Sequence, residues 1–179
     1  VILSTDSELY RDIGVKFGAN APYLRPKNLS HDASTDYDFI LYHIKWLKEK
    51  GMGVPDLSVY LRPTYPTRKV SDIDKAIKMF VSNYNSIDSL RSVVKASISP
   101  YKMWKYKNKL LSPVINEGES YNSPRQILED VYWQNACIDI VKLNTITRLH
   151  SVSGKRIMPF FMDEDEVFDI DSMKDFEKI

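Results

Sequence analysis

Residues 56–61 read DLSVYL, and residues 62–68, which follow directly, read RPTYPTR. The first segment alternates between apolar and polar side chains, a pattern typical of a β-strand. The second places two prolines between Arg62 and Arg68, and it predicts a loop with a restricted backbone. A strand that ends in such a loop is typical of a sheet whose carboxyl edge binds a ligand. Two guanidinium groups favour an anionic ligand, although a proline turn with two solvated arginines would have the same sequence.

Segments on both sides of this loop predict alternating strands and helices. Strands are expected at residues 1–4, 89–97, 136–141 and 157–162. Helices are expected at residues 8–17, after a cap at Thr35 or Asp36, at residues 72–84, and briefly after Ser172. Because strands and helices follow one another in turn, we predict a Rossmann-like α/β fold, a three-layer sandwich with a mainly parallel sheet.

Residues 100–130 depart from this pattern. Aromatic side chains alternate along residues 101–106, and Asn108 has the character of a hairpin tip before Leu110. A long polar loop follows. We interpret this segment as an excursion out of the sheet, whose exposed aromatic side chains are suited to contact with a partner chain.

The composition limits the possible classes of protein. The chain has 179 residues, 43% of them apolar, which predicts a single domain over residues 1–179. A net charge of +1 and the lack of a basic segment argue against nucleic-acid binding. A single cysteine excludes an internal disulfide framework and favours a cytoplasmic location. No apolar run has the length of a membrane span, and no signal peptide is recognisable. Because no methionine precedes Val1, we expect the sequence to lack its natural start.

Asp169 and Asp171 form the first candidate site, a cation site. They are two residues apart, so in an extended segment both carboxylates point to the same side. Two carboxylates together with substrate phosphates are a usual ligand set for Mg²⁺. The alternative is that Asp171 only caps the last helix while Asp169 is solvated. The three histidines are scattered and suit no metal site.

Lys102, Arg125 and Asn135 are further candidates for ligand contact. The two cations stand in expected loops, where a lone charged residue is most often solvated. Asn135 ends an aromatic segment that begins at Val131, and small residues follow it. This arrangement would let a ligand approach the backbone. The sequence contains no nucleophile elbow, no glycine loop for phosphates and no dinucleotide-binding fingerprint.

Taken in order, six segments of the chain resemble the acylneuraminate cytidylyltransferases, the CMP-sialic acid synthetases and their relatives. The segments are STDS at residues 4–7, LRP at 24–26 with AST at 33–35, residues 61–68, PYK at 100–102, PRQ at 124–126 with Asn135, and DID at 169–171. The resemblance extends over nearly the whole chain. It implies a Rossmann-like nucleotidyltransferase fold with a protruding dimerisation element at residues 100–130, and therefore a homodimer.

The resemblance also implies an activity and a set of roles. Enzymes of this family transfer CMP from CTP to the anomeric hydroxyl of a nine-carbon acidic sugar, with Mg²⁺ and release of pyrophosphate. By position in the motifs, the implied cytidine contacts are Arg25, Ala33 and Thr35. The implied catalytic and metal-binding pair is Asp169 and Asp171. The implied sugar contacts are Arg62, Thr64, Lys102, Arg125 and Asn135.

The chain departs from the family pattern at several positions. Arg62 replaces a glutamine, Tyr65 a serine and Thr67 a leucine, while Asp139 stands where sialic acid enzymes commonly have tyrosine. We therefore expect an acceptor other than ordinary N-acetylneuraminate, for example a legionaminic- or pseudaminic-type acid. The family's triphosphate loop would precede Val1, so the chain as given is expected to be inactive. Two alternatives remain open, namely a non-catalytic binding or assembly module and an enzyme for an eight-carbon acidic sugar.

Overall fold

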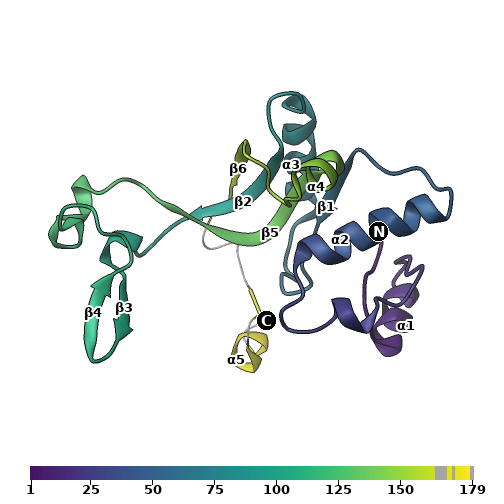
Figure 1. Cartoon of the computed structure of the whole chain (residues 1–179), viewed down its shortest axis with the longest axis horizontal. Helices are drawn as coiled ribbons and strands as arrows, with labels where there is room; N and C mark the ends of the chain where they lie inside the picture. The colour runs from purple at the N-terminus through teal and green to yellow at the C-terminus, as the bar shows by residue number, and fades with distance from the viewer. Residues whose placement is uncertain (164–168, 171, 178–179) are drawn as a thin grey trace. The chain divides into compact units, whose positions relative to one another are not determined.

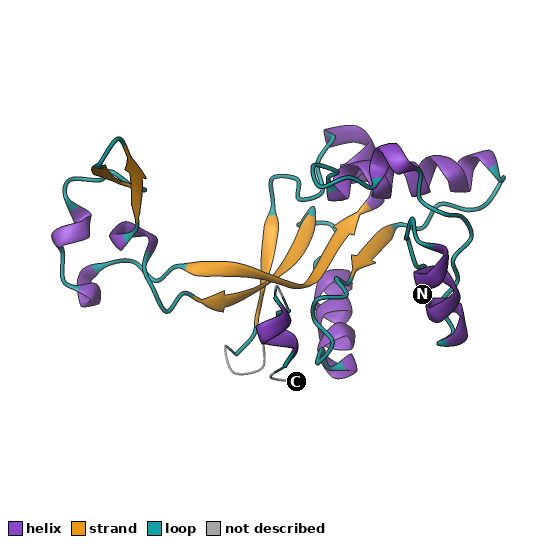
Figure 2. Ribbon diagram, turned by 90° about the horizontal axis from the view of Figure 1, so that it is seen from below, coloured by secondary structure: helices purple, strands orange, loops and turns teal. Residues whose placement is uncertain are grey.

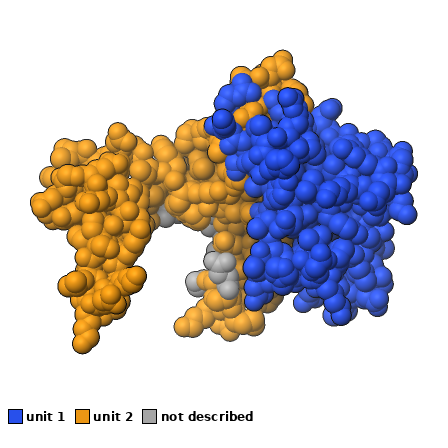
Figure 3. Space-filling model, viewed as in Figure 1, with its two compact units in different colours: residues 1–58, 141–156 blue, residues 59–140, 157–179 orange. Residues whose placement is uncertain are grey.

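The computed structural model describes residues 1–163, 169–170 and 172–177 (Figure 1). The chain divides into two compact units (Figure 3). The first unit contains residues 1–58 and 141–156, and the second contains residues 59–140 and 157–179. Among the described residues, none of the helices combines the length and the apolar character that a membrane span requires.

The helices of the first unit begin at capping residues that the sequence predicts. Helix α1 spans Glu8–Lys16, and the Ser7 side chain accepts a hydrogen bond from the Tyr10 N–H at its start. Helix α2 spans Asp36–Glu49 and begins with a reciprocal capping box between Thr35 and Asp38. The unit also contains a 3₁₀ turn, η1, at Lys27–Leu29. Both predicted long helices of this unit are confirmed.

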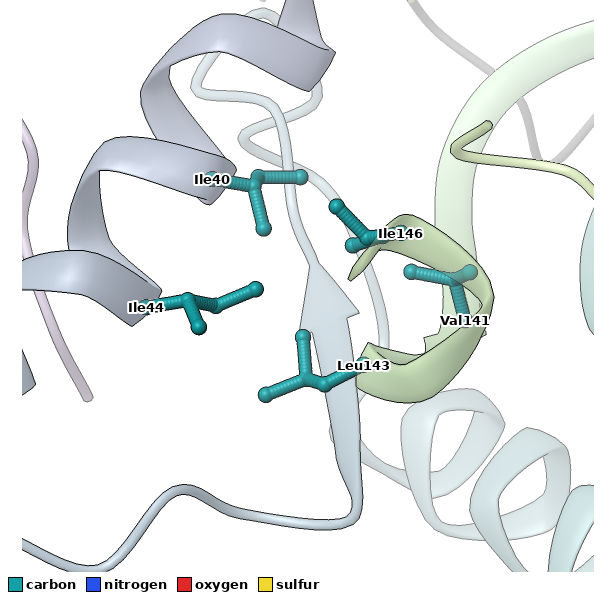
Figure 4. Close-up of a cluster of buried hydrophobic side chains, with 5 residues drawn as sticks. All are labelled: Ile40, Ile44, Val141, Leu143 and Ile146. Atoms are coloured by element: carbon teal, nitrogen blue, oxygen red, sulfur yellow. The ribbon is translucent and has the colours of Figure 1, made fainter. Parts of the chain in front are cut away.

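The core of the first unit lies between α2 and a short helix that the sequence did not predict. Helix α4 spans Leu143–Leu149 and contacts α2. Figure 4 shows the two sides of this core, which are formed by Ile40 and Ile44 on α2 and by Val141, Leu143 and Ile146. All five side chains are buried. This burial of apolar surface accounts for the position of α4, which is too short to be stable as a helix alone.

The prediction of a buried strand at residues 1–4 is wrong. These residues form only an isolated parallel bridge between Ile2 and Asn20. Val1 is 97% exposed and Ile2 is 48% exposed. The apolar composition of this segment suited a buried strand, but within the described part of the chain no neighbouring strand pairs along its length.

The main sheet has four strands in the order β1-β5-β2-β6. Figure 2 draws its strands in orange. The strands are β1 at Leu57–Tyr60, β2 at Ser89–Lys95, β5 at Tyr132–Lys142 and β6 at Ile157–Phe161. Strand β2 pairs with β6 in parallel, with Ser89 opposite Ile157. Helix α3, at Val70–Ser82, contacts β2. The predicted α/β fold with a mainly parallel sheet is confirmed.

The excursion forms a separate two-stranded sheet within the second unit, which we call the arm (Figure 1). Strand β3 at Trp104–Lys107 pairs antiparallel with β4 at Leu110–Pro113. Asn108 and Lys109, between the strands, both have positive φ angles, as a tight hairpin turn requires. The predicted hairpin tip is therefore confirmed. Three short 3₁₀ turns complete the arm, namely η2 at Pro100–Lys102, η3 at Ser120–Asn122 and η4 at Arg125–Ile127.

A short helix, α5, ends the described chain at Met173–Phe176. Its N-cap is Ser172, whose hydroxyl donates a 2.6 Å hydrogen bond to the Asp175 carboxylate. The sequence offered Asp171 as a possible cap for this helix. Because Ser172 has that position, the helix-cap alternative for Asp171 loses its basis.

Candidate functional site

The loop at residues 62–68, which joins β1 to α3, is held against strand β5 by Arg68. The Arg68 Nε donates to the backbone carbonyl of Cys137 at 2.7 Å, and its Nη2 donates to the carbonyl of Arg62 at 2.8 Å. The guanidinium also lies 5.9 Å from the ring centre of Tyr65, which is only 2% exposed. These contacts correct the prediction that both arginines are available for an anion, since Arg68 braces the loop.

Arg62, at the start of the loop, forms an ion pair with Asp139 on β5. The Arg62 Nη1 lies 3.1 Å from the Asp139 Oδ2. Arg91, on β2, approaches the same oxygen at 3.6 Å, and the Gln134 amide donates to it at 3.3 Å. The Arg62 guanidinium also lies 4.8 Å from the ring centre of Tyr60. The Asp139 carboxylate therefore lies between the guanidinium groups of Arg62 and Arg91.

Asp169 lies next to the same loop. The backbone N–H of Ile170 donates to the carbonyl of Thr64 at 2.9 Å, so the residue before it is fixed beside residues 62–68. The Asp169 Oδ1 is buried and has no hydrogen-bond partner within the described part of the chain. A buried carboxylate oxygen without a donor fits a hard cation such as Mg²⁺. Asp171, the other half of the predicted pair, lies outside the described residues.

Asn135 has structural contacts that explain its position. It is 1% exposed, and its Oδ1 accepts hydrogen bonds from the Ser92 hydroxyl at 2.5 Å and from the Cys137 N–H at 3.1 Å. The Ser92 hydroxyl oxygen in turn accepts the N–H of Ile138 at 2.8 Å. Ala136 has a φ of 59°, so β5 bends at this point. These contacts give Asn135 a structural role beside the bend, and its predicted contact with the sugar stays a prediction.

The predicted cytidine contacts all belong to the first unit. The Arg25 N–H donates to the Thr5 carbonyl at 2.7 Å, and its Nε donates to the Ser30 hydroxyl at 3.1 Å. Thr35 and Ala33 are exposed. The Thr35 hydroxyl donates to Asp38 at 2.6 Å as part of the capping box. The segment between Arg25 and Thr35 is therefore fixed at both ends by local hydrogen bonds.

Two other predicted sugar contacts, Lys102 and Arg125, lie in the arm. The Lys102 ammonium donates to the carbonyls of Tyr121 at 3.2 Å and Ser123 at 2.9 Å, which joins η2 to η3. Arg125 lines a cavity of about 260 Å³ at the base of the arm together with the ion pair between Lys95 and Asp130. The structure thus brings Arg62, Thr64 and Asp169 together at one loop, while Lys102 has its contacts within the arm and Arg125 lines the cavity that it shares with Lys95.

Known proteins resemble this chain along almost its whole length. It is 29% identical over 178 residues to the post-translational flagellin modification protein B of Campylobacter coli, which covers 99% of this chain and 74% of that protein. It is 27% identical to an N-acylneuraminate cytidylyltransferase of Streptococcus agalactiae, over 98% of this chain and 40% of that protein. It is 23% identical to the pseudaminic acid cytidylyltransferase of Campylobacter jejuni, over 99% of this chain and 75% of that protein. These similarities support placing the chain among the cytidylyltransferases for acidic sugars. No family model matches it.

A solved structure supports the fold of this chain. The structure of CMP:2-keto-3-deoxy-manno-octonic acid synthetase complexed with CTP superposes with a TM-score of 0.64. It covers 98% of this chain and 76% of that protein, at 11% sequence identity. At this identity the likeness establishes the fold, an α/β nucleotidyltransferase fold, and not the acceptor.

Sequence reasoning missed part of this candidate site. Arg62 and Asp139 were each recognised as departures from the family pattern, but not as partners. Arg91 and Gln134 were not recognised at all. The available signal was a charged residue in the middle of each of two strands, Arg91 in β2 and Asp139 in β5, because such a residue is seldom buried without a partner.

Proposed function

We propose that the protein transfers CMP from CTP to a hydroxyl group of an acidic nonulosonic sugar. In this reaction the sugar oxygen forms a bond to the α-phosphorus of CTP. The bond from that phosphorus to the bridging oxygen breaks, and pyrophosphate leaves with the electron pair. The observation that carries the proposal is similarity over 98–99% of the chain to relatives named as cytidylyltransferases for such acids. The proposal concerns the whole protein, because the chain spans 40% of the length of some of these relatives.

The loop at residues 62–68 supports a role in binding the acceptor sugar. An acidic sugar carries a carboxylate, and a guanidinium matches a carboxylate in both charge and geometry. Arg62 supplies that group, and Thr64 lies two residues away on the same loop. Because Arg68 and Ile170 fix the backbone of this loop, Arg62 and Thr64 are held in position before a ligand binds.

We further propose that Asp169 and Asp171 hold Mg²⁺ for this reaction. The buried Asp169 Oδ1, which lacks a hydrogen-bond partner among the described residues, supports this assignment. When bound, the ion would supply positive charge against the phosphate oxygens of CTP. Asp169 also lies beside the loop proposed to bind the acceptor sugar, because the N–H of the next residue, Ile170, donates a hydrogen bond to the carbonyl of Thr64. This arrangement would bring the nucleotide phosphates close to the sugar hydroxyl.

The experiment that tests the activity is a CTP-dependent pyrophosphate-release assay on the full-length protein. The acceptor panel contains N-acetylneuraminate, legionaminic-type and pseudaminic-type acids, and an eight-carbon acid as a comparison. We expect release with at least one nine-carbon acid, together with a product whose mass equals that of the CMP-sugar. The other three nucleoside triphosphates, ATP, GTP and UTP, serve as matched controls, and CTP should be preferred. Absence of release with every acid in the panel would refute the proposal.

We also propose that two copies of the chain associate through the arm. Opposite residues of an antiparallel pair have their side chains on the same face. The register of β3 and β4 therefore gathers Trp104, Tyr106, Leu111 and Pro113 on one face. Tyr106 is 72% exposed and Leu111 is 62% exposed, an exposure of apolar surface that favours a partner chain.

Sedimentation velocity tests this assembly. We expect the wild-type protein to sediment as a dimer and Tyr106→Lys to shift it toward the monomer, because the change puts a charge into the apolar face. Lys107→Ala, on the opposite face of the same strand, is the matched control and should leave the dimer intact. Equal sedimentation of all three proteins would show that the hairpin face is not the interface.

A further inference from the structure

We propose that Asp139 is a positioning residue, and that Asp139, Arg62, Arg91 and Gln134 act together to select the acceptor sugar. We call these four residues the Asp139 cluster. The inference rests on the proposed function and names a determinant of its acceptor choice. It assigns the selection to the ion-paired cluster as a unit instead of to Arg62 alone.

The order of the strands explains how the cluster forms. Strand β5 lies between β1 and β2 in the sheet. Arg62 follows the end of β1, Asp139 is on β5 and Arg91 is on β2. One carboxylate on the central strand therefore reaches a guanidinium on each side, at 3.1 Å and 3.6 Å. The cluster depends on the fold, because Arg62 and Asp139 are 77 residues apart in sequence.

Partial burial makes these ion pairs different from those on the open surface. The Asp139 side chain is 12% exposed, that of Arg91 is 16% exposed and that of Arg62 is 25% exposed. Loss of one partner from a partly buried pair leaves a charge that water only incompletely solvates. Without the carboxylate, the two guanidinium groups would repel each other across β5. Asp139 therefore contributes to the position of both groups.

Arg62 is held at its backbone as well as at its guanidinium. The Arg68 Nη2 donates to the Arg62 carbonyl at 2.8 Å, while Asp139 and the Tyr60 ring contact the guanidinium. A side chain that is fixed in this way loses little conformational entropy when a ligand binds. It also discriminates between ligands more sharply than a mobile one, because it cannot adapt to an acceptor of a different shape. The position of Arg62, and not only its charge, should therefore define the acceptor.

This reasoning predicts that Asp139 and Arg62 are energetically coupled. Asp139→Asn retains the size of the side chain but removes the charge that holds Arg62. We expect it to change the ratio of kcat/KM between two acidic sugars by about tenfold or more, as Arg62→Gln should do. We expect the double variant to differ little from the more affected single variant, because both changes disrupt one unit. The KM for CTP should change by less than about twofold, because the variants lose contacts with the acceptor sugar and none with the nucleotide.

The test is a double-mutant cycle on the full-length protein, measured on the acceptor panel. Asp12→Asn is the matched control, because it makes the same chemical change in an exposed ion pair of α1 with Arg11, and it should leave the ratios unchanged. Asp139→Glu keeps the charge and should restore part of the wild-type ratio. Circular dichroism and thermal unfolding identify any variant that fails to fold. If one of the variants in the cycle does not fold, the acceptor ratios are compared between the more conservative variants Arg62→Lys and Asp139→Glu and their double variant.

Three results would overturn the inference. They are unchanged acceptor ratios in Asp139→Asn, additive effects in the double variant, and an effect limited to the melting temperature. Failure of the proposed function gives a different result, since the wild-type protein itself would then lack CTP-dependent release with every acid. In that case calorimetric titration with the sugar acids tests the cluster. Heats of binding that are absent, or unaffected by Asp139→Asn, would refute it.

Discussion

The buried position of Asn135 leads to a prediction that separates its two possible roles. If its role is structural, Asn135→Ala should destabilise the protein. The change removes the acceptor for the Ser92 hydroxyl and for the Cys137 N–H, and both of these residues are almost fully buried. A buried polar group that loses its partner costs about 1–3 kcal/mol. Two groups lose their partner here, but the Ser92 hydroxyl can rotate toward another hydrogen-bond acceptor. We therefore expect the free energy of unfolding to fall by about 2–4 kcal/mol in total.

Urea unfolding followed by circular dichroism measures this loss. Such a value is a large fraction of the roughly 5–15 kcal/mol that stabilises a domain, so the midpoint should shift clearly. Ser92→Ala is the matched control within the same network. It removes one donor to Asn135 and leaves the Ile138 N–H without its acceptor, at a cost of about 1–3 kcal/mol.

A double variant completes the comparison. Because Ser92 and Asn135 are partners, the double change should cost less than the sum of the two single changes, by about 0.5–3 kcal/mol. The reasoning is refuted if Asn135→Ala unfolds at the wild-type urea concentration while the KM for the acceptor sugar rises. That combination would return Asn135 to the role of sugar contact that the sequence predicted.

Two further predictions concern a cation site and a titration. Asp169→Asn should raise the Mg²⁺ concentration required for half-maximal pyrophosphate release by tenfold or more without altering the circular dichroism spectrum, and an unchanged Mg²⁺ dependence would contradict the assignment. His43 is half-buried and shares a 2.9 Å hydrogen bond with the Tyr23 hydroxyl, and burial lowers its pKa from 6.5. Because a lowered folded-state pKa means that the unfolded chain binds the proton more readily, stability should fall as the pH falls below 6.5 toward the lowered value. His43→Gln should flatten this dependence in thermal unfolding, and an equal slope in both proteins would exclude His43 as its source.

Elements with local signals could be predicted from the sequence. The capping box at Thr35 and the helical spacing of Ile40, Ile44 and Leu47 define α2, and these three residues are buried as the spacing requires. The hairpin tip at Asn108 was equally local, because the turn needs two residues that tolerate positive φ. In each case the residues that specify the element are within a few positions of one another.

Elements that depend on distant neighbours were missed or misassigned. Helix α4 has only seven residues and acquires its stability from packing against α2, which no local pattern reveals. Residues 1–4 have the composition of a buried strand, but burial is decided by what lies opposite them. Strand β5 was expected only over residues 136–141, but it also includes most of the aromatic segment before it, and Ala136, with its positive φ, lies where the two parts join.

The candidate site shows the same division. The sequence predicted the loop at residues 62–68 and its position at the end of a strand, because proline and alternation are local features. It did not predict that Arg62 and Arg68 have different roles, since each role depends on which oxygen atom of a distant residue the guanidinium contacts. Arg68 meets backbone carbonyls and Arg62 meets the Asp139 carboxylate.

This difference has an electrostatic consequence for the proposed reaction. Carbonyl oxygens carry no net charge, so Arg68 braces the loop and still contributes its full positive charge to the local field. Arg62, by contrast, shares the Asp139 carboxylate with Arg91. The positive charge of Arg68 would attract both an acidic sugar and the triphosphate of CTP, whereas the Asp169 carboxylate would repel the same phosphates unless a cation lies between them.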